Sequence, residues 1–187
     1  MEIYPHAKVI ISILVSFALT HLLRELARVV EHPKSLQLYW VHLVWVVFAF
    51  LYVISFWWWE YWLEKLPSWN FPLYLFVTLY GVFLYFFCAL LMPNDLTGYK
   101  GFRDYFYSRR RWLFGVMAAI YVFDWIDSLI KAQQLPMLGS YYGIVLVFLV
   151  GSIIAIKTQN ERFHAAFAVM GTLYQGLHLL WYFTVRR

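Results

Sequence analysis

The sequence predicts an all-α protein, a polytopic membrane bundle of about six transmembrane helices. Three observations lead to this fold class: 63% of the 187 residues are hydrophobic, only 13% are charged, and six apolar stretches follow one another along the chain. A soluble domain usually has about 45–50% apolar and about 25% charged residues. A chain this apolar needs lipid as the solvent for most of its surface, so we expect residues 1–187 to form a single transmembrane domain.

Six stretches provide the roughly 20 mostly apolar residues that a membrane span needs. In chain order they are 8–30, 38–62, 71–92, 112–131, 141–157 and 162–185. The breaks between them hold turn-forming residues, for example Pro67 with Asn70 and Pro93 with Asn94. Only residues 158–161 separate the last two stretches, which predicts a tight helical hairpin.

Lysine and arginine residues predict how the helices are oriented. The side that holds the first, third and fifth connections collects ten of them, and the opposite side collects five. Because basic residues accumulate on the cytoplasmic side, we expect a multi-pass protein of a bacterial inner membrane with both termini away from the cytoplasm. The net charge of +5 lies at the ends of the apolar stretches, so it indicates contact with lipid headgroups and no nucleic-acid partner.

Two groups of residues are expected at the lipid–water interface. Residues 93–111 are predicted to be a basic interfacial loop that meets lipid headgroups. Its arginines in this role are Arg103, Arg109, Arg110 and Arg111. Trp57, Trp58 and Trp59 close the second stretch and predict an aromatic belt, since indole rings favour the interface.

The two halves of the chain can be aligned as an internal repeat. Residues 20–24 fall on 123–127, residues 39–44 on 141–146, and residues 78–80 on 172–174. The longer connection between the second and third stretches accounts for the change in offset. This alignment predicts two three-helix units, 1–92 and 112–187, with inverted topology, an arrangement common in transporters.

Polar and charged residues inside the predicted spans form the candidate functional site. A charge within a span costs about 2.5–3.5 kcal/mol on insertion scales and marks function by default. The candidate polar pathway consists of His21, Arg24, Glu25, Asp124, Asp127, Gln175 and His178. The predicted topology brings His21 and Asp124 to the midplane from opposite sides, so we expect a contact between them. The open alternative is that Arg24, Glu25 and Asp124 satisfy one another and only hold the bundle together.

This pattern predicts a channel or transporter for a small ion or a proton, in which Asp124 and His21 titrate at the midplane. The bilayer, a small inorganic ion or proton, and further copies of the chain or another membrane protein are the expected partners. Gly143, Gly151 and Ser152 would permit close helix contact in such an assembly.

Two alternatives stay open beside transport. One is a membrane redox protein that binds a b-type haem or a quinone, with His21, His164 and His178 as candidate haem ligands. The fourteen-residue spacing of His164 and His178 is similar to that of paired histidines in b-type cytochromes. The other is a non-catalytic scaffold or accessory subunit. The sequence shows no phosphate-binding glycine loop, zinc-ligand spacing or nucleophile elbow, so neither an enzyme nor a metal site is predicted.

Four segments of the chain resemble a group of small bacterial six-span membrane proteins. The segments are Ala18-Leu19-Thr20-His21-Leu22-Leu23, Phe56-Trp57-Trp58-Trp59, Pro93-Asn94-Asp95-Leu96 and Tyr105-Phe106-Tyr107-Ser108-Arg109-Arg110. The resemblance implies six spans and implies no particular activity.

Overall fold

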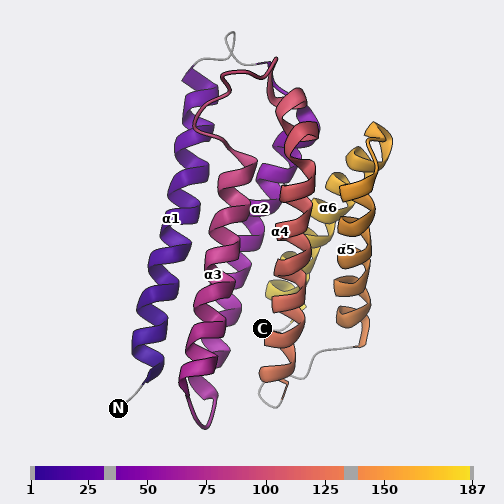
Figure 1. Cartoon of the computed structure of the whole chain (residues 1–187). Coiled ribbons are helices and arrows are strands. Elements are labelled where there is room, and N and C mark those ends of the chain that lie inside the picture. The colour runs from indigo at the N-terminus through magenta and orange to yellow at the C-terminus, as the bar shows by residue number, and fades with distance from the viewer. Residues whose placement is uncertain (1–2, 32–36, 133–138, 186–187) are drawn as a thin grey trace.

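Every regular element is a helix in the residues that the computed structural model describes, which are 3–31, 37–132 and 139–185 (Figure 1). In chain order the helices are α1 (Ile3–Glu31), α2 (Trp40–Trp59), the 3₁₀ helix η1 (Glu60–Lys65), α3 (Phe71–Leu91), α4 (Phe102–Ile130), α5 (Gly139–Lys157) and α6 (Glu161–Val185). The predicted all-helical bundle is thereby confirmed.

Four long apolar helices indicate a membrane location. The helical segments that are long and apolar enough to cross a bilayer are Ile3–Glu31, Trp40–Lys65, Phe71–Leu91 and Phe102–Ile130. The segment Tyr141–Lys157 of α5 is apolar but shorter. Large apolar side chains are exposed around the bundle, among them Val9, Phe17, Leu75, Phe86, Val122, Leu146, Leu173 and Leu177. Spans at α5 and α6 remain predictions.

Local capping explains where several helices begin. The Asn70 side chain accepts a hydrogen bond from the Leu73 amide (2.9 Å), and a proline follows in the first turn of α3. At α6, the Asn160 side chain accepts from the amide of Arg162 at 2.9 Å. These caps confirm the two turns that the sequence predicts at Asn70 and before the last helix.

The start of α4 corrects the predicted connection between the third and fourth helices. The sequence analysis gives residues 93–111 as a loop, but α4 begins at Phe102 and continues to Ile130 without a break. A helix of 29 residues is about 43 Å long, which exceeds the roughly 30 Å of a hydrocarbon core. The basic residues therefore lie on the first turns of a long helix, where Phe102 and Phe106 are buried at helical spacing.

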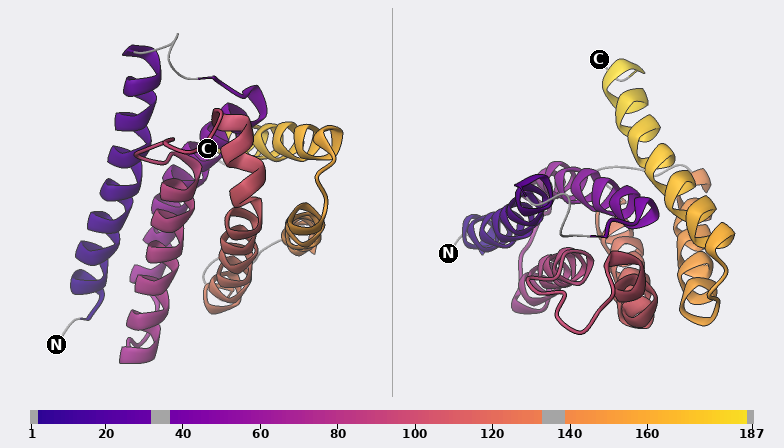
Figure 2. Two further views of the ribbon diagram at one scale, coloured as in Figure 1. Left: turned by 45° about the horizontal axis from the view of Figure 1, so that its top comes forward. Right: turned by 90° about the horizontal axis from the view of Figure 1, so that it is seen from above.

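The helix pairs do not support the predicted repeat. In the described residues α1 packs mainly on α3, whereas α4 packs mainly on α5 and α6 packs on α2. Equivalent three-helix units would pair α4 with α6 in the way that α1 pairs with α3. In the left view of Figure 2, α6 runs across the direction of α3 and α4, whereas α1 runs alongside α3.

Two close contacts hold α6 against α5. A Cβ atom at Gly151 would lie 2.7 Å from the Phe167 ring, and a Cβ at Gly171 would lie 3.0 Å from Phe148. Gly151 therefore makes its close contact within the chain, whereas the sequence analysis proposes it for an assembly of chains; a Cβ at Gly143 would have no neighbour within 4 Å. Toward its C-terminal end α6 separates from α5 (Figure 2).

Aromatic side chains fill the core at the end of the bundle where α4 and α6 begin, which we call the basic end. Trp45 of α2, Phe114 of α4 and Phe167 of α6 are all buried there. The ring centroid of Trp45 lies 5.5 Å from that of Phe114 and 5.2 Å from that of Phe167. Edge-to-face packing at these separations closes the centre of the bundle at the basic end.

Candidate functional site

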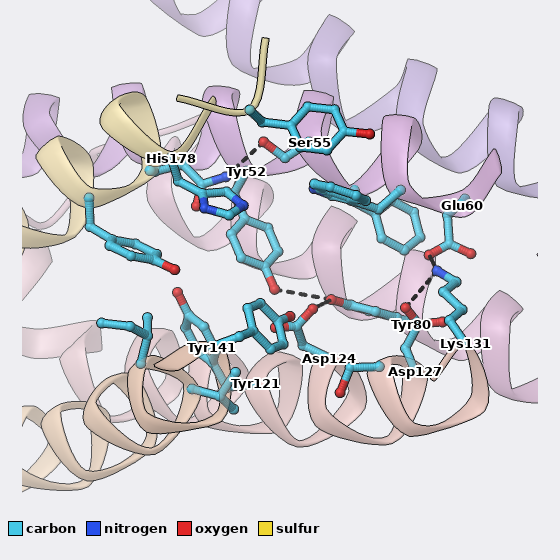
Figure 3. Close-up of a pocket in the computed structure, with 18 of the residues that line it drawn as sticks. Tyr52, Ser55, Glu60, Tyr80, Tyr121, Asp124, Asp127, Lys131, Tyr141 and His178 are labelled. Atoms are coloured by element: carbon cyan, nitrogen blue, oxygen red, sulfur yellow. Dashed lines mark hydrogen bonds and ion pairs between the residues drawn. The ribbon is translucent and has the colours of Figure 1, made fainter. Parts of the chain in front are cut away.

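A cavity of about 480 Å³ lies in the opposite half of the bundle, where α2 and α4 end (Figure 3). Side chains from α2, η1, α3, α4, α5 and α6 line it. Its position follows from the separation of α5 and α6 beyond their contacts at Gly151 and Gly171. The volume is in the range of about 300–1,000 Å³ that small-molecule sites usually have.

A buried ion-pair cluster forms one wall of the cavity. The ammonium of Lys131, directly after α4, donates to Glu60 Oε1 of η1 at 2.8 Å and to Asp127 Oδ2 at 2.6 Å. The Lys131 side chain is 1% exposed, and those of Glu60 and Asp127 are 4% and 9% exposed. One buried cation therefore holds two buried carboxylates, and it joins α4 to the end of α2.

The second oxygen of each of these carboxylates lacks a donor. Within the described part of the chain, neither Glu60 Oε2 nor Asp127 Oδ1 accepts a hydrogen bond, although both atoms are buried. A buried acceptor without a donor costs about 1–3 kcal/mol, and more when it is charged. The cluster has therefore more negative charge than Lys131 balances.

A third carboxylate, Asp124, faces the same cavity and is held by tyrosine hydroxyls. Tyr80 of α3 donates to Asp124 Oδ1 at 3.1 Å, and Tyr141 of α5 donates to Asp124 Oδ2 at 2.6 Å. The Tyr52 hydroxyl lies 3.0 Å from the Tyr80 hydroxyl, and it must be the donor there because Tyr80 already donates to Asp124. Figure 3 shows this chain of hydroxyls leading to the carboxylate.

Residues of α6 close the cavity on the side opposite α4. Gln175 Nε2 donates to Ser55 Oγ of α2 at 2.7 Å, which fixes the amide against α2. His178 stacks on Tyr174 with ring centroids 5.7 Å apart, and its ring lies 6.2 Å from that of Trp59. The wall is therefore aromatic with a few polar groups.

The charge around the cavity is unbalanced. Three carboxylates and one ammonium line it, which gives a formal charge of −2 when all are ionised; they are Glu60, Asp124, Asp127 and Lys131. Burial of uncompensated charge among apolar helices is costly, so the carboxylates need protons or a further cation.

No protein-family model, curated protein or solved structure matches the chain. The assignment of a function therefore depends on the chemistry of the cavity and its surroundings.

The charged residues of α1 form a separate cluster near the basic end. Glu25 pairs with Arg24 Nε at 3.1 Å and with Arg28 Nη2 at 3.0 Å. Arg24 also donates to the Asn94 side chain at 2.8 Å. Arg28 donates to two backbone carbonyl oxygens of the connection after α3, those of Pro93 and Asn94. These bonds tie α1 to the end of α3.

The contact expected between His21 and Asp124 does not form. His21 Nε2 donates to the carbonyl oxygen of Met92, just after α3, at 2.7 Å. Asp124 accepts a hydrogen bond from Tyr80 instead. Tyr80 precedes Met92, the partner of His21, by twelve residues, which is about 18 Å along the axis of α3. The expectation was wrong because hydropathy gives the approximate depth of a residue but not the helix that it faces.

The seven residues of the predicted polar pathway thus divide between two places. Asp124, Asp127, Gln175 and His178 line the cavity. The others, His21, Arg24 and Glu25, lie in the α1 cluster.

The three histidines considered as haem ligands have different surroundings. His21 and His164 each direct Nε2 to a backbone carbonyl oxygen, that of Met92 and that of Thr158 respectively. His178 lines the cavity, about 21 Å from His164 along α6. In the described residues no group of three or more histidine, cysteine, aspartate or glutamate side chains could hold a metal ion.

The arginines at the basic end make few ion pairs. Arg103 pairs with Glu161 at the start of α6 (2.9 Å), and Arg109 donates to the Tyr99 hydroxyl (2.9 Å). Arg110 is buried and donates to the Tyr107 carbonyl oxygen (2.7 Å), whereas Arg111 is exposed. The predicted contact of these side chains with lipid headgroups remains a prediction.

One residue of the connection before α4 has a shifted pKa outside the membrane segments. The Thr97 hydroxyl donates to Asp95 Oδ1 at 2.6 Å, and the Thr97 amide donates to the same oxygen at 2.8 Å. These bonds favour the ionised carboxylate, so they lower the pKa of Asp95 below its ordinary value.

The tryptophans at the end of α2 divide between two cavities. Trp59 lines the cavity described above, whereas Trp57 and Trp58 line a second cavity of about 430 Å³ beside the start of α1. Glu60 and Tyr182 line both. The predicted aromatic belt therefore includes at least one residue, Trp59, that faces inward.

The sequence analysis did not select Glu60, Tyr80 or Tyr141 as partners of the cavity aspartates. Glu60 lies within a run of aromatic residues, where it is the one charged residue in 57–62. The separation of Asp127 and Lys131 by four residues is a usable signal for a pair on one helix face. The tyrosines of the hydroxyl chain gave no signal, because tyrosine is frequent throughout this sequence.

Proposed function

We propose that the protein is a proton-coupled transporter of a small cation, and that the cavity is its binding site. The observation that carries this proposal is the excess of carboxylates over cations around a cavity enclosed by apolar helices. In such surroundings a carboxylate is stable when it holds a proton or when a cation lies beside it.

Asp124 is the carboxylate best placed to exchange a proton for a cation. It is only partly buried, unlike Glu60 and Asp127, so a molecule in the cavity can reach it. The hydroxyls of Tyr80 and Tyr141 fix its two oxygens without neutralising its charge. A bound cation and a bound proton would exclude each other there, and this exclusion is the basis of coupled transport.

Other titratable groups surround Asp124 and shape the pH dependence of any exchange. These groups are Tyr52 of α2, Glu60 of η1, Tyr80 of α3, Tyr121 and Asp127 of α4, Lys131 directly after α4, Tyr141 of α5, and Tyr174, His178 and Tyr182 of α6, with Tyr4 and Lys8 of α1 beyond Glu60. The ammonium of Lys131 stays between Glu60 and Asp127, so it does not neutralise Asp124 directly.

The packing of the bundle favours a transporter over an open channel. The cavity lies in one half, and the aromatic core around Trp45, Phe114 and Phe167 fills the other. A cation that leaves toward the basic end needs those side chains to move apart. With the predicted orientation, the cavity lies on the non-cytoplasmic side and the arginine-rich end lies on the cytoplasmic side.

The test is cation-driven proton movement in liposomes. The purified protein is reconstituted with a trapped pH-sensitive dye and an interior more acidic than the exterior, and sodium, potassium or 2-phenylethylammonium is then added outside. At least one of these cations should drive protons out of the liposomes. Asp124→Asn should abolish the movement, and Glu25→Gln, a matched change in the α1 cluster, should preserve it.

Two results would overturn the proposal. One is the absence of protein-dependent proton movement with every cation in the series. The other is an unchanged rate in Asp124→Asn, which would remove the cavity from the transport path. Both variants replace a carboxylate with an amide of similar size, so size-exclusion chromatography in detergent verifies that each one is folded.

A further inference from the structure

We infer that the cation bound in the cavity is an organic ammonium ion, a protonated primary amine attached to an apolar or aromatic body. This inference rests on the proposed function, because it names the class of cation for the same site.

The dimensions of the cavity favour an organic ion over a metal ion. A metal ion needs a compact shell of oxygen ligands at about 2.0–2.6 Å. The cavity measures about 480 Å³, and in the described residues no cluster of three or more metal-binding side chains occurs. A molecule with an arylalkyl skeleton makes use of that volume, whereas a bare ion does not.

The walls of the cavity suit a cation with an apolar body. Aromatic rings from α2, α4, α5 and α6 surround the space, among them Tyr52, Trp59, Tyr121, Tyr141, Tyr174 and Trp181. An ammonium group within about 6 Å of such a ring is attracted to its face by about 0.5–2 kcal/mol. Ile144 and Val145 of α5 add an aliphatic surface for the rest of the molecule.

The charged groups are placed at one side of this aromatic space. Asp124 lies on α4, one turn from Asp127 and two turns from Lys131 of the ion-pair cluster. Its two oxygens each accept one tyrosine hydroxyl and keep lone pairs for further donors. The three N–H groups of a primary ammonium match these acceptors, and the body of the ligand then extends toward Tyr174 and Ile144.

The binding test compares a charged ligand with a neutral ligand of the same shape. Binding of 2-phenylethylammonium and of 2-phenylethanol to the purified protein in detergent is measured by calorimetry, with potassium chloride as the competing inorganic cation. We expect 2-phenylethylammonium to bind about tenfold or more tightly than 2-phenylethanol, because only the ammonium pairs with Asp124. Potassium chloride should weaken binding only by raising the ionic strength, and sodium chloride at the same concentration should weaken it equally.

Two variants locate the site. Asp124→Asn should remove the preference for the charged ligand, while Glu25→Gln should leave it unchanged. Trp181→Leu, a change at a ring that is 45% exposed and so tolerant of substitution, should weaken 2-phenylethylammonium by about two- to fivefold through the loss of a cation–π contact.

The outcomes separate this inference from the proposed function. If 2-phenylethanol binds as tightly as 2-phenylethylammonium, the organic-ammonium assignment is wrong. It is also wrong if neither compound binds while sodium or potassium drives proton movement in liposomes. In both cases the transporter proposal stands. If 2-phenylethylammonium binds with the expected preference and no cation drives protons, the assignment stands and the transporter proposal is wrong.

Discussion

Two clusters of charged residues in this bundle both lie in apolar stretches of the sequence, but they differ in charge balance and in exposure. The α1 cluster has two arginines around one carboxylate, and its spare donors reach backbone carbonyl oxygens of Pro93 and Asn94. The cavity cluster has one lysine among three carboxylates, and two of its buried oxygens lack donors in the described chain. Arg24 is also 62% exposed, whereas Lys131 is 1% exposed.

The difference is the reason why we propose a ligand site at the cavity cluster and none at the α1 cluster. What distinguishes the two clusters is the balance of charge and the adjoining cavity, since within the described residues both contain buried polar atoms without a hydrogen-bond partner, which in the α1 cluster are Glu25 Oε2 and Arg28 Nε. In the α1 cluster two arginines more than balance the charge of Glu25, and the cluster ties α1 to the end of α3. The cavity cluster has two more carboxylates than ammonium groups, and it lines a cavity of about 480 Å³.

The largest effect is expected from Lys131→Met. This change leaves Glu60 and Asp127 buried without their cation, and removal of one partner from a buried pair typically costs about 3–5 kcal/mol. A large fall in the melting temperature in detergent should be seen. The double variant Lys131→Met with Asp127→Asn should regain part of it, since one uncompensated charge is then absent. A double variant no more stable than the single one would contradict the charge argument.

A smaller effect is expected from Arg28→Gln in the α1 cluster. Loss of its bonds to two carbonyl oxygens and to Glu25 should lower stability by about 1.5–3 kcal/mol, measured as the melting temperature. The affinity for 2-phenylethylammonium should not change. Arg111→Gln is the matched control, because Arg111 is exposed and makes no ion pair within the described residues. A loss of ligand affinity in Arg28→Gln would show that the clusters are coupled.

The contact between α5 and α6 tests how the cavity is formed. Gly151→Ala places a methyl group 2.7 Å from Phe167, so we expect a loss of about 1–3 kcal/mol in stability. Gly143→Ala on the same helix meets nothing within 4 Å and should be neutral or slightly stabilising. Equal melting temperatures for the two variants would show that α6 is not held at Gly151.

The smallest effect is expected from Thr97→Val in the connection after α3. The bond from Thr97 lowers the pKa of Asp95, so it adds stability that is present above the unfolded pKa of about 3.9 and is lost as the pH falls through the lower folded value. Thr97→Val should therefore melt slightly below the wild type at neutral pH, and the difference should shrink in acid. A difference that is constant with pH would assign the effect to packing.

Hydropathy predicted the helices well where the surroundings are uniformly apolar. The predicted segments 38–62 and 71–92 differ from Trp40–Lys65 and Phe71–Leu91 by at most three residues at an end. The first turns of α4 were missed because their arginines lower the hydropathy, although Phe102 and Phe106 keep a helical spacing of buried residues.

The site was predicted only as a set of residue types. Asp124, Asp127, Gln175 and His178 were selected because they are polar within apolar stretches, and they face one cavity. Their partners could not be predicted, because Glu60 and Tyr80 are distant in sequence and only the tertiary packing of α3 and η1 on α4 brings them there. Hydropathy gives no information on which helices are neighbours, so it also gave the wrong partner for His21.

The most direct test of the central claim is the number of protons released when a cation enters the cavity. Calorimetry of 2-phenylethylammonium binding in buffers of different ionisation enthalpy measures this number. We expect release of about one proton per cation bound in the wild type and in Glu25→Gln, and none in Asp124→Asn. Binding without proton release in the wild type, or equal release in Asp124→Asn, would contradict the assignment of the unbalanced carboxylates as the site where a cation replaces a proton.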